Sequence, residues 1–191
     1  RRRFERVVEA AAAAGIRPPW IHMANSSALL RYPAARGTLA RPGIAFYGVP
    51  PYAGSQDQVS LTPALSWKSR VIYLKMVPEG FPVSYARTWT AARPTRVATL
   101  AVGYADGYPR SLGNGAGRVM IRGHLFPVIG HVCMDMTMVD VTGHSEIEAG
   151  DEVLVFGDEL PVAQVARWAG TIPYEILTGI SLRVQRVYFE E

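Results

Sequence analysis

The sequence predicts an α+β chain, in which a short α/β segment is followed by a mainly antiparallel β domain. Two observations support this fold class. Helix-like and strand-like segments alternate over the first 48 residues, which is typical of a parallel α/β unit. After a stretch rich in Pro and Gly, short apolar runs are separated by Gly, Pro or Asn turns. That pattern is typical of an antiparallel sandwich or barrel.

The α/β segment begins with a predicted helix. Residues 3–14 are good helix formers with an apolar stripe that includes Phe4 and Val8, and Gly15 provides a C-terminal stop. The elements that follow are a strand over residues 20–24, a helix N-cap at 25–27, a brief helix over 28–35 and a strand over 41–48.

The β domain follows a predicted linker. Turn formers and polar residues dominate residues 51–60, and residues 61–191 then form the domain. Its strands are expected at 64–77, 95–102, 118–121, 125–129, 136–141, 152–156 and 182–189, with a hairpin turn at 122–124, a helix at 162–168 and a further segment at 173–179.

The composition is that of a globular chain and argues against several classes of protein. The 191 residues are 49% hydrophobic, which is enough to bury a core. The formal charge of +4 is scattered, so we expect no nucleic-acid partner. No apolar run approaches the roughly 20 residues of a membrane-spanning helix. A single cysteine, Cys133, excludes an intrachain disulfide framework, and no signal-peptide pattern is present, so we expect a cytoplasmic protein.

The loop at residues 101–110 carries the most suggestive chemistry. It follows an apolar run and contains two phenols and a carboxylate, Tyr104, Tyr108 and Asp106, beside two glycines. Loops of this kind at a strand end often carry catalytic residues. An ordinary hairpin turn with two tyrosines at its rim would contain the same residue types.

Two further segments predict either ligand binding or ordinary local structure. Asn25 and Ser26 follow a strand and open a helix, where backbone N–H groups and the Ser26 hydroxyl would bind an anion such as phosphate. A plain helix N-cap has the same sequence. Gly43 would let a ligand approach the backbone closely, whereas Arg41 before a proline also fits an exposed strand start.

The sequence predicts no metal site. Cys133 and Asp135 supply too few ligands for zinc or iron. The histidines are dispersed along the chain as His22, His124, His131 and His144. One more phenol, Tyr174, follows a proline and is also typical of a half-buried core tyrosine.

Five motifs, taken together and in this order, closely resemble the C-terminal half of the alanine racemase family. They are HMANS at 22–26, RPGIAFYG at 41–48, VGYADGY at 102–108, GHVCMD at 130–135 and PYEIL at 173–177. The resemblance implies a pyridoxal 5'-phosphate enzyme that interconverts L-alanine and D-alanine, the latter for peptidoglycan. It also implies an N-terminal eight-stranded α/β barrel, a C-terminal β domain and a head-to-tail homodimer. Residues 1–50 would then be the last strands and helices of the barrel.

The resemblance also implies roles for individual residues. Tyr104 matches the catalytic tyrosine, which exchanges the α-proton on the L face and reaches into the partner subunit's site. Met134 matches the position whose backbone N–H meets the substrate carboxylate. Arg41 matches the arginine that hydrogen-bonds the pyridine nitrogen. The residues that match the phosphate-binding group are Ser26, Gly43, Ile44 and Tyr174.

These roles agree with the chemistry of racemisation. Proton exchange on both faces of one carbon needs two bases on opposite sides. A free phenol has a pKa of about 10, so a tyrosine base needs a neighbouring positive charge or hydrogen-bond donor. Arg41 cannot give up its proton, so it would leave the pyridine nitrogen largely unprotonated. This weakens the electron sink and disfavours transamination or decarboxylation, which favours a racemase over other pyridoxal enzymes.

The family's cofactor-bearing lysine, which is the base for the D face, has no matching motif here. Lys68 and Lys75 are the only lysines, and both lie in a predicted strand. We therefore expect a C-terminal piece of a longer racemase, completed by the N-terminal barrel half of the same protein and inactive as a lone chain.

Alternative functions remain open at this point. A serine or broad-specificity amino-acid racemase of the same fold would share these motifs, because one methyl or hydroxyl group is worth only about 1–3 kcal/mol of discrimination. A pyridoxal decarboxylase fits Arg41 and the tyrosine loop less well. From another class, a non-catalytic β module would bind anions through its net positive charge.

Overall fold

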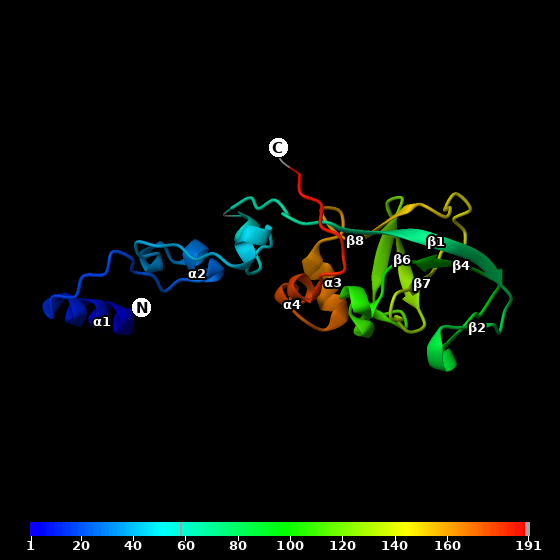
Figure 1. The fold of residues 1–191 in the computed structure, drawn as a ribbon, viewed down its shortest axis with the longest axis horizontal. Helices are drawn as coiled ribbons and strands as arrows, with labels where there is room; N and C mark the ends of the chain where they lie inside the picture. Colours follow the sequence, from blue (N-terminus) through cyan, green and yellow to red (C-terminus); the bar gives the residue numbers. More distant parts are fainter. Residues whose placement is uncertain (58, 190–191) are drawn as a thin grey trace. The chain divides into compact units, whose positions relative to one another are not determined.

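The computed structural model describes residues 1–57 and 59–189, which divide into two compact units, Arg1–Ala64 and Leu65–Glu191. Figure 1 traces both units in sequence colours. The predicted linker includes residue 58, and the predicted β domain includes residues 190 and 191; these three lie outside the described residues. In the described ranges, no helix has the length and apolar character needed to span a membrane.

The first unit contains the two predicted helices. Helix α1 (Arg2–Ala13) ends before Gly15, whose φ of 79° lies in the region that favours glycine. Helix α2 (Ser26–Arg31) is capped by Asn25, whose Oδ1 accepts a hydrogen bond from the Ala28 N–H at 3.0 Å. Three 3-10 turns follow: η1 (Pro33–Ala35), η2 (Ile44–Tyr47) and η3 (Ser55–Asp57).

The strand predicted over residues 20–24 is wrong. This segment pairs with no strand in the described part of the chain. Its hydrogen bonds go to a turn, because the Ile21 N–H donates to Thr38 Oγ1 at 2.8 Å and the Ile21 carbonyl accepts from the Thr38 N–H at 2.8 Å. Apolar β-formers make a strand only where a second strand accepts their backbone hydrogen bonds.

The strand predicted over residues 41–48 is also wrong, since this segment forms turn η2. Pro42 has no N–H to donate to a neighbouring strand. The N–H groups of Gly43 and Ala45 donate to Ser26 Oγ at 2.8 and 3.3 Å. The backbone donors that a strand would need are therefore committed to a side chain of helix α2.

The second unit is built around a closed six-stranded barrel (Figure 1), with strand order β1-β4-β7-β6-β5-β8. Every neighbouring pair is antiparallel. The predicted antiparallel β domain is therefore confirmed, and it is a barrel. The strands are β1 (Trp67–Val77), β4 (Thr95–Leu100), β5 (Arg118–Ile121), β6 (His124–Ile129), β7 (Thr137–Asp140) and β8 (Glu152–Phe156).

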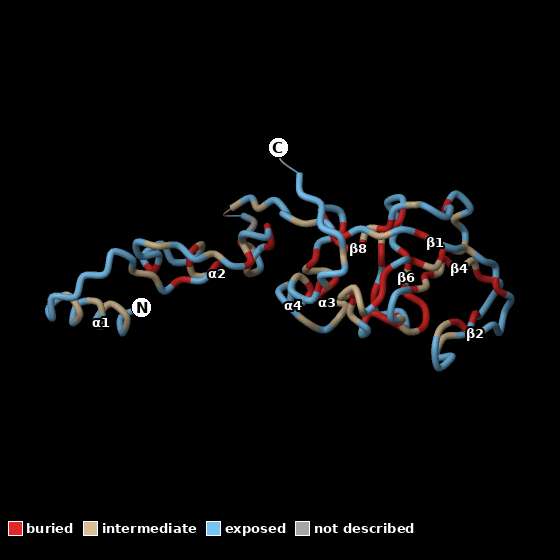
Figure 2. Tube along the Cα trace, in the orientation of Figure 1, coloured by how far each residue is buried: buried red, intermediate tan, exposed pale blue. Residues whose placement is uncertain are grey.

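The barrel encloses the core of this unit. Burial alternates along β5 and β7, as expected when every second side chain points inward. Figure 2 shows the buried segments running along the strands. The barrel closes where Trp67 pairs with Phe156, and the two rings meet edge to face with centroids 5.9 Å apart. Apolar burial of this kind supplies most of the stabilisation.

The remaining elements lie outside the barrel strands. Helix α3 (Val162–Ala169) is present as predicted, and the segment at 173–179 forms a second helix, α4 (Pro173–Gly179). The short hairpin of β2 (Pro82–Val83) and β3 (Trp89–Thr90) was not predicted, because two residues are too few to show a strand pattern.

The closing strand predicted over residues 182–189 is wrong. No strand forms there in the described range, and Tyr188 and Phe189 are 85% and 87% exposed. The physical reason is the closed barrel, in which β1 pairs with both β4 and β8. A closed barrel has no free edge on which a further strand could pair.

Candidate functional site

Tyr104 lies on a tight 3-10 turn, η5 (Tyr104–Asp106), that follows strand β4. The Gly103 N–H donates to Asp106 Oδ2 at 2.9 Å, and the Asp106 N–H donates back to the Gly103 carbonyl at 3.1 Å. Gly107 ends the turn with a φ of 104°, which favours glycine. Tyr104 itself is 44% exposed. The turn therefore fixes the backbone while the phenol stays accessible.

The Tyr104 turn packs on the loop that carries Met134. The Tyr104 N–H donates to the Cys133 carbonyl at 3.0 Å, and the Ala105 N–H donates to the Met134 carbonyl at 3.0 Å. The Met134 N–H has no acceptor among the described residues, and the residue is exposed. Two of the predicted site residues are thus brought together, with one backbone donor free for a ligand.

Helix α4, which carries Tyr174 in its first turn, is attached to the same turn through its C-terminal end. The Ser181 N–H donates to the Asp106 carbonyl at 2.9 Å. A Cβ atom on Gly107 would lie 2.2 Å from the Gly179 carbonyl oxygen, so only glycine permits this approach. Tyr174 is exposed and does not belong to the core.

An arginine that the sequence interpretation missed connects these loops. Arg183 Nε lies 3.1 Å from Asp106 Oδ1, and Arg183 Nη2 lies 2.9 Å from Asp135 Oδ1. One guanidinium therefore bridges the Tyr104 turn and the Met134 loop. The two aspartates fall inside the motifs, but nothing in the sequence indicates which basic residue joins them.

The second phenol of the motif has a different environment. Tyr108 is buried, its ring packs edge to face on Trp67, and its hydroxyl has no hydrogen-bond partner in the described structure. Burial raises the pKa of Tyr108 well above the ordinary value of a phenol. The alternative of an ordinary hairpin turn with two tyrosines at its rim is wrong for Tyr108, which is a core residue.

Three other predicted site residues meet in the first unit. Ser26 is buried, and its Oγ accepts hydrogen bonds from the N–H groups of Gly43 and Ala45. Its hydroxyl proton is left to donate, because the oxygen is the acceptor in both of these hydrogen bonds. The Ile44 N–H has no acceptor among the residues described.

This group fits a phosphate. A phosphate oxygen accepts hydrogen bonds from hydroxyl and backbone N–H donors, and both kinds are free at Ser26 and Ile44. Gly43 leaves space, since the nearest atom to a Cβ built there is Ser26 Oγ at 4.0 Å. Arg41 precedes this group and is exposed. Of the seven predicted residues, four thus lie in the first unit and three in the second.

Two histidines that are distant in the sequence lie together in the second unit. The rings of His124 and His144 have centroids 4.7 Å apart, and His144 Nδ1 lies 2.8 Å from Glu146 Oε1. The expectation that the histidines are dispersed is therefore wrong for this pair. Strands β6 and β7 are neighbours, and this pairing brings the start of one strand close to the chain that follows the other.

Comparison with known proteins finds matches over almost the whole chain. A model described as "Alanine racemase, N-terminal domain" matches residues 1–51, and one described as "Alanine racemase, C-terminal domain" matches residues 64–188. The alanine racemase of Symbiobacterium thermophilum is 46% identical over 190 residues, which cover 97% of this chain and 50% of that protein.

Solved structures agree with these matches. The alanine racemase of Streptomyces coelicolor A3(2) superposes with a TM-score of 0.92 at 38% identity, covering 99% of this chain and 50% of that chain. The Bartonella henselae alanine racemase with covalently bound pyridoxal phosphate has a TM-score of 0.85 at 34% identity, covering 95% and 50%. The chain thus spans about half the length of the relatives it matches. Since the C-terminal domain model alone covers more than half of its residues, the chain belongs to the alanine racemase family.

Proposed function

We propose that the full-length protein catalyses the pyridoxal-phosphate-dependent interconversion of L-alanine and D-alanine, in which this chain supplies one of the two acid–base groups. The observation that carries the proposal is the Tyr104 turn. It presents an exposed phenol on a backbone held by Asp106 and by the Cys133 carbonyl. A general base must be held within about an ångström of its working position, and this turn meets that need.

Tyr104 acts at the α-carbon of the substrate. Its phenolic oxygen takes the α-proton from L-alanine and returns it in the reverse direction, while the base for the D face is a lysine on the rest of the protein. The Met134 N–H binds the substrate carboxylate. This role fits the structure, because no group in the described residues accepts a hydrogen bond from this N–H. Both groups lie on loops that are bonded to one another, so carboxylate and α-carbon are positioned together.

The cofactor-binding residues of this proposal are Ser26, Arg41, Gly43, Ile44 and Tyr174. When bound, pyridoxal phosphate supplies an electron-withdrawing ring that acidifies the α-hydrogen of the amino acid. Arg41 would hydrogen-bond the pyridine nitrogen, and a guanidinium does not transfer its proton to that nitrogen. The phosphate would be held by Ser26, Gly43, Ile44 and Tyr174, of which the first three lie in one hydrogen-bonded group.

The organisation of the whole protein belongs to the same proposal. Residues 1–50 complete an α/β barrel, residues 51–60 link it to the β domain, and residues 61–191 form that domain. The protein is a cytoplasmic homodimer in which Tyr104 enters the partner subunit's active site, and its D-alanine is used for the cell wall. The division into two domains is supported by the two family matches, of which one ends at residue 51 and the other begins at residue 64. It is also supported by the boundary between the two compact units at residues 64 and 65.

The test is α-hydrogen exchange in D₂O by the full-length protein with pyridoxal phosphate. Loss of one base of a pair costs roughly 10²–10⁴-fold. Tyr104→Phe should therefore lose exchange from L-alanine by at least about 100-fold, while D-alanine still exchanges through the second base. Tyr108→Phe, which removes the buried phenol of the same motif, should exchange both enantiomers normally. Equal exchange from both enantiomers by Tyr104→Phe would refute the assignment.

A further inference from the structure

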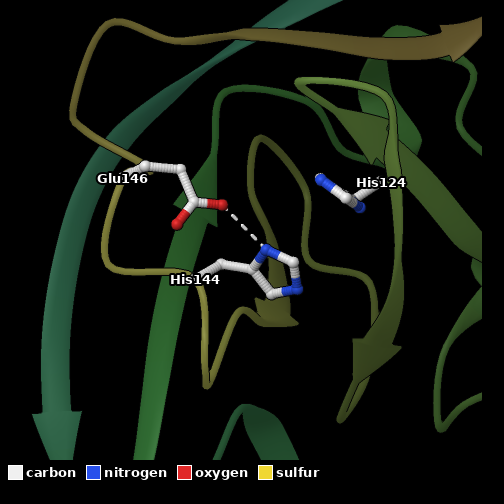
Figure 3. A group of neighbouring side chains, drawn as sticks. All are labelled: His124, His144 and Glu146. Atoms are coloured by element: carbon white, nitrogen blue, oxygen red, sulfur yellow. Dashed lines mark hydrogen bonds and ion pairs between the residues drawn. The ribbon is translucent and has the colours of Figure 1, made fainter.

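A cluster of ligand-type side chains lies at one end of the barrel. His124 is the first residue of β6, and His144 and Glu146 lie on the connection from β7 to β8. Figure 3 shows the two imidazoles and the carboxylate facing a common space, with His144 bonded to Glu146. One ligand atom from each residue lies within 4.8 Å of the others. None of these residues has a part in the proposed racemase site.

Arginine hydrogen bonds hold both backbone segments that carry this cluster, the β7–β8 connection and the turn before His124. The Arg96 guanidinium donates to the His144 carbonyl and, at 2.7 Å, to the Ile147 carbonyl, which fixes the β7–β8 connection. Arg122, in the turn before His124, makes two hydrogen bonds to Asp151 at 2.8 and 2.7 Å. The β5–β6 hairpin and the β7–β8 connection are thus already joined, so ligand binding costs little further conformational entropy.

The side chains have the chemistry of a transition-metal site. Imidazole nitrogen and carboxylate oxygen are common zinc ligands, and a four-coordinate ion completes such a set with water. Two of the ligands are already in contact, since His144 Nδ1 lies 2.8 Å from Glu146 Oε1. As metal ligands, imidazoles are neutral and a carboxylate is anionic, so the set suits a divalent cation.

We propose that His124, His144 and Glu146 bind one zinc ion per chain. Zinc lies about 2 Å from each ligand atom, so modest side-chain rotations close the observed spacing. Binding replaces the hydrogen bond between His144 Nδ1 and Glu146 Oε1, and both histidines ligate as neutral imidazoles. Its effect is structural, because it cross-links the β5–β6 hairpin to the β7–β8 connection.

Phe126 favours a defined geometry for the site. Its ring packs edge-on against His144, with centroids 4.9 Å apart and an interplanar angle of 90°, and it also contacts His124 at 6.5 Å. These contacts restrict the rotation of both imidazoles. A site of this kind prefers zinc, nickel or copper over magnesium, which requires oxygen ligands in an octahedron.

The experiment is a calorimetric titration of the full-length holoprotein with ZnCl₂, after treatment with a chelator that is then removed. We expect one saturable zinc ion per chain, and no saturable binding of MgCl₂. His144→Gln and Glu146→Gln should each weaken zinc binding by about tenfold or more. Thermal unfolding of the unsubstituted protein should shift upward with zinc, and a chelator should reverse the shift.

Matched controls separate this site from other zinc ligands. Glu148→Gln changes a carboxylate two residues along the same connection, and His131→Gln changes the histidine near the free thiol of Cys133. Both should bind zinc with unchanged affinity. The proposal is overturned if the unsubstituted protein binds no zinc, or if His131→Gln weakens binding while His144→Gln does not. Because the chelator reversal uses the unsubstituted protein, the test does not depend on a variant that folds.

Discussion

The backbone of Gly103 approaches Met134 so closely that a Cβ atom at residue 103 would lie 2.3 Å from the Met134 carbonyl oxygen. The obstacle on the other side is also backbone, since the Cys133 carbonyl oxygen would lie 2.4 Å away. Neither oxygen can move without breaking the hydrogen bonds that the two carbonyls accept from Tyr104 and Ala105. Glycine at this position is therefore a condition for placing the phenol beside the Met134 loop.

Gly103→Ala should destabilise the protein by about 1–3 kcal/mol, the usual cost of overpacking, and should separate the Tyr104 turn from the Met134 loop. Chemical denaturation of the full-length protein measures the first effect, and racemisation measures the second. Gly179→Ala is the matched control, because the nearest atom to its Cβ would be 3.9 Å away. Equal stability of the two variants would contradict the steric argument.

Arg183→Gln should lower the rate of racemisation strongly and the free energy of unfolding only slightly. The arginine is 51% exposed, so its ion pairs contribute about 0–1 kcal/mol to folding. Loss of the bridge between Asp106 and Asp135 should misplace Tyr104 relative to Met134 and lower kcat by about tenfold or more. Arg183→Lys should restore part of the rate by keeping one ion pair. Arg186→Gln, a nearby exposed arginine, should retain full activity, and an equal loss there would show a general charge effect.

Ser26→Ala should weaken the binding of pyridoxal phosphate. The substitution removes a hydroxyl donor and leaves the Gly43 and Ala45 N–H groups without their acceptor, which costs about 1–3 kcal/mol. Cofactor affinity follows from absorbance titration of the cofactor-free full-length protein. Ser27→Ala is the neighbouring control, since its hydroxyl donates to the Pro51 carbonyl instead. Unchanged affinity in Ser26→Ala would exclude this serine from the phosphate site.

Tyr108→Phe should leave the free energy of unfolding at neutral pH unchanged or raise it by up to about 2 kcal/mol. The reason is that it removes a buried hydroxyl without a hydrogen-bond partner. The pH dependence has a definite sign. Below pH 10 the phenol is neutral in both states; above about pH 10 it ionises only when unfolded, since burial raises the pKa of Tyr108 in the folded state. Stability therefore falls as the pH rises in this range. Denaturation between pH 8 and 11 should show a smaller fall in Tyr108→Phe.

Local patterns predicted the β domain well. The strands at 118–121 and 152–156 were predicted to the residue, because apolar alternation there is bounded by clear turn residues. The hairpin turn at 122–124 was recognisable for the same reason, and Arg122 and Gly123 adopt φ values of 49° and 78°. A strand can be predicted without information from distant residues when its apolar alternation and its bounding turns lie in one continuous segment.

The failures depend on partners that are distant in the sequence. Residues 182–189 alternate like a strand, yet barrel closure between β1 and β8 leaves no edge for them. The Arg183 bridge and the pairing of His124 with His144 depend on how loops meet in three dimensions. The burial of Tyr108 also depends on the fold, because the sequence does not indicate which of the two neighbouring tyrosines is buried.

The partnership of Trp67 with Phe156 has a consequence for folding during synthesis. These residues are the first and last of the barrel, and β8 pairs with both β1 and β5. Until β8 has been translated, both strands expose unpaired edges, which are templates for aggregation. Closure must also wait for the contact of greatest sequence separation, which slows folding. A released chain that ends before residue 152 would have two open edges, whereas one that ends after residue 156 contains every strand of the barrel.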